Sequence, residues 1–201
     1  MMRRTAWDVC RYHLGSDIPQ QLINMKTSDG ISRLDKVRLP SSIRMTRVFV
    51  YGTLKKGQPN YYRMLDPANG KAEYLGSALT TEKFPLVITS KYNIPFLLNI
   101  PGQGHRVHGE VYRVDDQMLK FLDDFESVPT WYQRNVVQLE VKEWVGKPDG
   151  GEAAPSPGSI TEAFIYNTTS YQSEWKALRC FESYDANGDH GLKYVYREER
   201  D

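Results

Sequence analysis

Two short segments of this 201-residue chain have the residues expected of a ligand-binding loop and of a proton-transfer group. In the first, the apolar residues 48–50 run directly into Tyr51, Gly52, Thr53 and Leu54. Gly52 permits close approach of a ligand to the backbone, and consecutive N–H groups after a strand can form a concave anion site that suits a carboxylate. The same pattern also fits an ordinary junction between a strand and a turn, so it is compatible with both interpretations.

The second segment is a cluster of carboxylates, Asp123, Asp124 and Glu126, followed closely by Pro129. Asp123 and Glu126 are three residues apart and would share one face of a helix. On that face, like charge and partial burial would both raise a carboxyl pKa toward the range that is useful for proton transfer. A solvated acidic helix end is the alternative, although carboxylates at a helix C-terminus are opposed by the helix dipole.

The sequence around these two segments predicts mostly short strands. One helix is predicted from Asp115, a good N-cap, to Phe125, because Met118, Leu122 and Phe125 recur on one face. Many short strands with few helices predict an α+β fold built on a mixed, partly closed β-barrel. Apolar runs bounded by Gly, Pro and Asn predict the strands, which are residues 47–51, 74–79, 85–89, 107–114, 132–143 and 161–166.

The composition gives no sign of a nucleic-acid or membrane partner. The chain has 26 Lys and Arg against 25 Asp and Glu, a net charge of +1, whereas nucleic acid and anionic bilayers call for clustered basic residues. No apolar run approaches the about 20 residues that cross a bilayer. The two cysteines, Cys10 and Cys180, are far apart and lack the spacing of a metal site, which favours a reducing, cytoplasmic setting.

The first 44 residues differ from the rest in charge and in pattern. They hold eight basic residues against four Asp, a net charge of +4, which leaves 18 basic and 21 acidic residues in residues 45–201. No apolar period runs through residues 1–44, and the four Asp argue against a mitochondrial transit peptide. We therefore expect residues 1–44 to be a poorly ordered extension and residues 45–201 to form the functional domain.

Other candidate motifs are weaker. Asp185, Asn187 and Asp189 begin like a calcium loop, but His190 stands where that loop needs glycine. The sequence contains no phosphate-binding loop, dinucleotide fingerprint or nucleophile elbow. We expect neither a metal nor a cofactor.

Five segments, two of which contain the 51–54 loop and Glu126, are more specific as an ordered set than any one of them is alone. They are VFVYGTLKKGQPN at 48–60, NIPFLLNIPG at 93–102, GEVYRVD at 109–115, LDDFES at 122–127 and YQR at 132–134. Together they resemble the γ-glutamylcyclotransferase-like family, and in particular the branch that acts on γ-glutamylamines. The resemblance runs from about Val48 to the end of the chain, including HGLKY at 190–194, and it implies a small mixed β-barrel with short helices.

The resemblance also implies an activity and a site. The family converts a γ-glutamyl amine to 5-oxoproline and a free amine, and this branch acts on γ-glutamyl-ε-lysine, a breakdown product of transglutaminase cross-links. By resemblance, the loop of residues 51–54 holds the γ-glutamyl group, and Glu126 is the catalytic acid/base. Tyr132 and Arg134 are implied to line the pocket or to brace Glu126.

Two alternatives remain open at this point. The 51–54 loop and Glu126 would recognise only the γ-glutamyl half of a substrate, so free γ-glutamyl amino acids or glutathione are alternative substrates. A module that binds γ-glutamyl compounds or 5-oxoproline without turnover is the other, and the presence of Glu126 counts against it. We expect a small-molecule partner, and the sequence makes no prediction of the oligomeric state.

Overall fold

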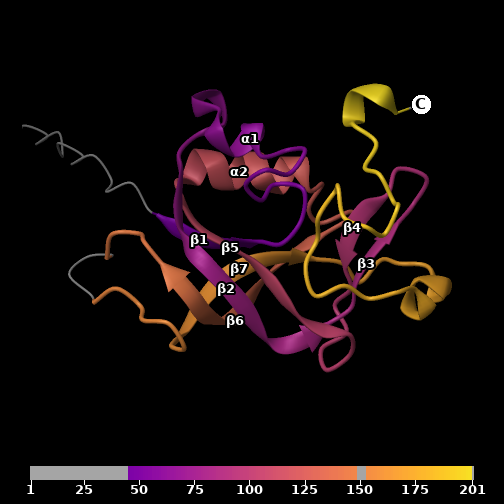
Figure 1. Ribbon diagram of the computed structural model, residues 1–201. Coiled ribbons are helices and arrows are strands. Elements are labelled where there is room, and N and C mark those ends of the chain that lie inside the picture. Colours follow the sequence, from indigo (N-terminus) through magenta and orange to yellow (C-terminus); the bar gives the residue numbers. More distant parts are fainter. Residues whose placement is uncertain (1–44, 149–152, 201) are drawn as a thin grey trace, which may run out of the picture. The chain divides into compact units, whose positions relative to one another are not determined.

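Five strands close into a barrel, in the order β1-β5-β2-β6-β7 (Figure 1). The computed structural model describes residues 45–148 and 153–200. β1 pairs antiparallel with β5 and parallel with β7, and the parallel pairing closes the sheet. The predicted α+β fold on a mixed barrel is confirmed, whereas the prediction for residues 1–44 lies outside the described residues. The barrel strands are β1 (Thr46–Val50), β2 (Ala72–Phe84), β5 (His105–Val114), β6 (Gln133–Trp144) and β7 (Ile160–Asn167).

The barrel is tight where β1 ends beside β5. Val50 lies opposite Glu110 in the register of these two strands, and Gly109 comes immediately before Glu110. A Cβ atom on Gly109 would lie 2.5 Å from the Phe49 ring and 2.5 Å from the Val50 carbonyl oxygen. Glycine at this position therefore allows the two backbones to approach closely, directly before the 51–54 loop.

Both faces of β1 are buried, and each face belongs to a different apolar cluster. Phe49 lies in the cluster that includes Val111 of β5 and Leu139 of β6. Val48 and Val50 lie in a second cluster, together with the apolar residues of helix α2. Side chains alternate between the two faces of a strand, so burial on both sides explains the continuous apolar run. The end of β1 is thereby held firmly, and with it the start of the 51–54 loop.

Helix α2 (Asp116–Phe125) follows β5 and lies beside the barrel (Figure 1). The Asp115 side chain accepts a hydrogen bond from the Met118 N–H (2.8 Å), which confirms the predicted N-cap. The buried residues of the helix pack in the same cluster as Val48 and Val50 of β1. They are Met118, Leu122 and Phe125. α2 is therefore fixed along its length, and its C-terminal end leads to Glu126.

The sequence pattern predicts neither α1 (Tyr62–Leu65) nor β4 (Ile94–Leu97). β4 pairs only with β3 (Leu86–Thr89), in a separate two-stranded sheet. Proline cannot donate to a strand ladder, and Pro95 is accommodated because each strand of such a sheet keeps one open edge. None of the helices among the described residues is long and apolar enough to span a bilayer. The remaining short helices are 3-10 turns, η2 (Pro67–Asn69), η3 (Ser173–Ala177) and η4 (Arg197–Glu199).

The N-cap of α2 generates a stability prediction. We expect Asp115→Ala to lower the free energy of unfolding by about 1 kcal/mol, because the Met118 N–H loses its acceptor at the start of the helix. Asp115→Asn keeps a capping oxygen and should stay close to the unsubstituted protein. Urea unfolding at pH 7 measures both, and an Ala variant as stable as the Asn variant would show that the cap contributes nothing.

Candidate active site

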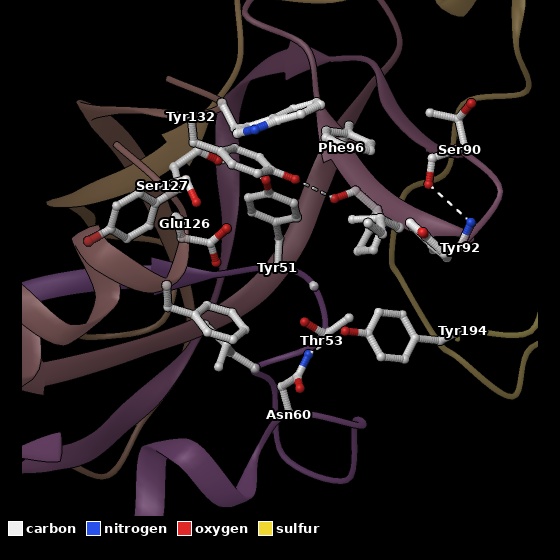
Figure 2. Close-up of a pocket in the computed structure, with 18 of the residues that line it drawn as sticks. Tyr51, Thr53, Asn60, Ser90, Tyr92, Phe96, Glu126, Ser127, Tyr132 and Tyr194 are labelled. Carbon is white, nitrogen blue, oxygen red and sulfur yellow. Dashed lines mark hydrogen bonds between the residues drawn. The ribbon is translucent and has the colours of Figure 1, made fainter. Parts of the chain in front are cut away.

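A cavity of about 800 Å³ is lined by the C-terminal end of β1, the end of α2, β4 and residues 194–200, called the C-terminal segment below. It brings together both segments that the sequence singles out, the 51–54 loop and Glu126 (Figure 2). Aromatic rings make up much of its wall, including Phe96, Trp131 and Trp175. A largely apolar cavity with a few polar groups is typical of a small-molecule site. Within residues 45–148 and 153–200, no group of three His, Cys, Asp or Glu side chains is arranged to hold a metal ion.

The 51–54 loop keeps its backbone N–H groups available. The Thr53 carbonyl accepts a hydrogen bond from the Asn60 N–H (2.9 Å), which fixes the turn. Among the turn and loop hydrogen bonds of the described residues, none is donated by the backbone of Gly52, Thr53 or Leu54. All three residues line the cavity. Their N–H groups can therefore meet a carboxylate or an oxyanion there.

Two buried tyrosines form a fixed part of the wall. The Tyr51 hydroxyl donates to the Tyr166 carbonyl (2.7 Å), and the Tyr132 hydroxyl donates to the Pro95 carbonyl (3.1 Å). The Tyr132 ring also stacks on Phe96, with 5.6 Å between the ring centroids. Burial raises the pKa of both tyrosines well above 10, so both stay neutral at physiological pH. These side chains shape the cavity and carry no charge into it.

Glu126 directly follows α2, and its carboxyl group points into the cavity toward Tyr51 (Figure 2). The Glu126 N–H donates to the Leu122 carbonyl (2.9 Å), and Ser127 adopts a left-handed φ of 55° that ends the helix. Burial raises the pKa of Glu126 to about 7, and the positive charge of Arg197 opposes part of that rise. Near neutral pH the carboxyl is poised between its two protonation states, as acid/base catalysis requires.

Asp123, three residues earlier, has a different environment. Its two oxygens accept hydrogen bonds from the Tyr166 hydroxyl (2.8 Å) and from Nη1 of Arg134 (2.6 Å). Burial, and not like charge from Asp123, raises the pKa of Glu126, which corrects one part of the sequence-based expectation. Tyr132 lines the cavity, but Arg134 is not among the lining residues and pairs with Asp123 instead. Any effect of Arg134 on Glu126 is therefore indirect.

The C-terminal segment supplies cavity residues that the sequence analysis did not assign, Tyr194, Arg197 and Arg200. Nη2 of Arg197 donates to the Phe125 carbonyl (2.8 Å), and its guanidinium lies 4.1 Å from the centroid of the Phe125 ring. The Tyr194 hydroxyl accepts a hydrogen bond from the buried Asn60 side chain (2.9 Å). Arg197 and Phe125 are 72 residues apart in sequence, and no local pattern indicates that they meet.

The raised pKa of Glu126 predicts that the free energy of unfolding decreases as the pH rises toward and through 7. The folded-state pKa of about 7 lies above the ordinary value of 4.5. The proton is therefore held more tightly in the folded state, and the stability that it contributes is complete below pH 4.5 and lost as the pH rises through 7. Glu126→Gln removes this dependence, so its stability relative to the unsubstituted protein should rise by up to about 3 kcal/mol between pH 4.5 and pH 8.

Urea unfolding of both proteins across this pH range measures the difference. Asp124→Asn is the matched control, because Asp124 is an exposed carboxyl paired with Lys120. A difference between Glu126→Gln and the unsubstituted protein that stays flat with pH would show that the carboxyl is not buried in solution.

The sequence matches a known protein family over most of the domain. A family model described as gamma-glutamyl cyclotransferase, AIG2-like, matches residues 48–186. This span includes the 51–54 loop and Glu126, and it ends before Tyr194, Arg197 and Arg200.

Named relatives and a solved structure agree with this match. A Danio rerio protein named gamma-glutamylaminecyclotransferase B is 53% identical over 155 residues, which cover 77% of this chain and 76% of that protein. The Mus musculus gamma-glutamylaminecyclotransferase is 51% identical over 156 residues, which cover 78% of this chain and 100% of that protein. A crystal structure of an AIG2-like protein from Mus musculus has a TM-score of 0.70 at 50% identity, covering 78% of this chain and 99% of that one. This chain therefore belongs to the AIG2-like γ-glutamyl cyclotransferase family.

Proposed function

We propose that this chain is a γ-glutamylamine cyclotransferase, which converts γ-glutamyl-ε-lysine from degraded transglutaminase cross-links to 5-oxoproline and free lysine. The observation that carries the proposal is a half-buried, desolvated carboxyl of raised pKa, Glu126, in one cavity with the available N–H groups of the 51–54 loop. The names of relatives that are about half identical to this chain support the same activity.

The substrate itself supplies the nucleophile in this reaction. Its α-amine attacks its own γ-carbonyl carbon, a new C–N bond closes a five-membered lactam, and the bond to the ε-nitrogen of lysine breaks. Water is not consumed, and no covalent intermediate with the protein forms. The main task of the protein is to hold an extended glutamyl chain in a folded, near-attack shape, which lowers the entropic part of the barrier.

Glu126 moves the proton that this reaction requires. At neutral pH the substrate α-amine is an ammonium and cannot attack, so Glu126 accepts one of its protons before the attack and passes it to the departing ε-nitrogen. After the attack the α-nitrogen gives up a second proton and becomes the lactam N–H, and Glu126 carries this proton to the ε-nitrogen too, so that lysine leaves with an ε-ammonium. With a pKa of about 7 instead of 4.5, the carboxyl is closer in basicity to the amine, and the first transfer is less uphill. One carboxyl therefore serves both steps, and the net charge of the site is restored at the end.

The 51–54 loop recognises the γ-glutamyl half of the substrate. The N–H groups of Gly52, Thr53 and Leu54 suit the α-carboxylate and the oxyanion that forms on the attacked carbon. The Tyr51 hydroxyl already donates to the Tyr166 carbonyl. Tyr51 therefore contributes the face of its ring to the wall, and the backbone of the following residues contributes the hydrogen-bond donors.

The central test is incubation of the purified protein with γ-glutamyl-ε-lysine, with both products quantified. We expect lysine and 5-oxoproline to appear in equal amounts, and Glu126→Gln to lower kcat by about 10² to 10⁴, the usual size of an acid/base contribution. Asp124→Asn is the matched control, because its exposed side chain is outside the cavity.

Each other outcome has a definite meaning. Lysine released together with glutamate would indicate hydrolysis and rule out attack by the substrate amine. A Glu126→Gln variant within a few-fold of the unsubstituted protein would remove Glu126 from the proton transfer. Faster release of 5-oxoproline from glutathione or γ-glutamyl amino acids would assign the other substrate class, and binding without product would indicate a module that only binds.

The pH dependence of kcat/KM provides a separate prediction. The base must be ionised, so kcat/KM should fall about tenfold per pH unit below pH 7, the pKa of Glu126 in the free protein. Arg197→Gln removes the positive charge that opposes the raised pKa, and should move this acidic limb to higher pH. A limb near pH 4.5 in the unsubstituted protein would contradict assignment of the proton transfer to a buried Glu126.

A further inference from the structure

The cavity is larger than the γ-glutamyl group requires. Its volume of about 800 Å³ is in the range that encloses a whole drug-sized ligand. The 51–54 loop and Glu126 account for one part of its wall, and Figure 2 shows Tyr92 and Tyr194 at a distance from Glu126 across the cavity. A substrate that occupies the cavity must therefore extend past the reacting carbonyl toward the C-terminal segment.

Two arginines of the C-terminal segment line the cavity, Arg197 beside Phe125 and Arg200 beside Tyr92 and Tyr194. Arg197 donates one hydrogen bond to the Phe125 carbonyl, and Arg200 donates two to the Val195 carbonyl (3.1 and 3.0 Å). A guanidinium has five N–H donors in all, so each keeps several. In the part of the chain that the structure describes, neither arginine forms an ion pair with a carboxylate.

Aromatic rings hold both guanidinium groups in place. Arg197 lies over Phe125, and the Arg200 guanidinium lies 4.9 Å from the Tyr92 centroid and 5.2 Å from the Tyr194 centroid. Such stacking limits the motion of a long side chain while its N–H edges remain free for a ligand. Both guanidinium groups line the cavity, are held by aromatic rings and form no ion pair among the described residues, so together they suit an anionic group of a ligand that extends beyond Glu126.

We propose that Arg197 and Arg200 bind the α-carboxylate of the amine leaving group, so that the C-terminal segment selects amines that end in a carboxylate. This inference rests on the proposed cyclotransferase activity. The four-carbon stem of a lysine leaving group suits the aromatic wall, and a guanidinium fork matches a carboxylate in geometry and charge. The α-ammonium on the same carbon then points away from the arginines toward solvent.

The two carboxylates of the substrate would thus have separate partners. The γ-glutamyl carboxylate meets the neutral backbone donors of the 51–54 loop, and the leaving-group carboxylate meets charged side chains. This arrangement predicts that the arginines discriminate between leaving groups, because every cyclotransferase substrate carries the same γ-glutamyl half.

The test compares two substrates that differ only at that group, γ-glutamyl-ε-lysine and its α-carboxamide, γ-glutamyl-ε-lysinamide. For the full-length protein we expect kcat/KM to favour the carboxylate by about tenfold or more, the usual size of a charge-assisted hydrogen bond. In the double variant Arg197→Gln, Arg200→Gln the ratio should fall to within about twofold of one. Any effect of Arg197 on Glu126 acts on both substrates and cancels in the ratio.

Arg179→Gln is the matched control, because it removes an exposed positive charge from the C-terminal region outside the cavity. Its ratio should equal that of the unsubstituted protein. The preference for the carboxylate should also weaken as salt is added, since ions screen an accessible charge pair.

The outcomes separate this inference from the proposed function. If both substrates yield 5-oxoproline and the double variant keeps the full preference for the carboxylate, the arginines do not bind that group and the inference is overturned. An equal loss on both substrates also overturns it, because the arginines would then act on the shared γ-glutamyl half or on Glu126. If neither substrate yields 5-oxoproline, the proposed function fails, and the inference fails with it.

Discussion

The whole candidate site is organised around one half-buried carboxyl group in the cavity wall, Glu126, whose pKa desolvation raises to about 7. Desolvation of an ionisable group costs free energy, so the rest of the structure must offset that cost and hold the group in place. α2 does this from both ends, through the Asp115 cap at its start and the buried Phe125 at its finish. The rigid end of β1 then places the 51–54 loop in the same cavity.

The contrast between Asp123 and Glu126 shows how neighbouring carboxylates take different roles. Asp123 receives hydrogen bonds on both oxygens from Arg134 and Tyr166, so it is held as a charged link between α2 and strands β6 and β7. Burial and the charge of Arg197 govern Glu126, and hydrogen bonding does not contribute to its pKa. A carboxylate that accepts hydrogen bonds on both oxygens stabilises the structure, whereas a carboxyl group without such partners can exchange a proton with a ligand.

Local sequence patterns predicted most of the fold, because they report burial and helix caps. The apolar run at β1, the cap at Asp115 and the apolar face of α2 each depend on neighbouring residues, and each prediction is confirmed. The sequence did not predict β4, because Pro95 breaks the pattern of a strand. It also did not predict that burial alone raises the pKa of Glu126, because burial depends on segments that are distant in sequence. Arg197 and Arg200 carry no local signal, since they reach the cavity only when the C-terminal segment folds back.

When the substrate supplies its own nucleophile, the protein needs no reactive side chain of its own and contributes mainly by positioning the substrate. Such a site needs one proton carrier, and its remaining residues must position two ends of an extended molecule on either side of the bond that breaks. The family match covers the 51–54 loop and Glu126, whereas Arg197 and Arg200 lie beyond it. In the proposed mechanism, the two halves of a substrate are recognised by different parts of the chain, and Arg197 links them because its charge also acts on the pKa of Glu126.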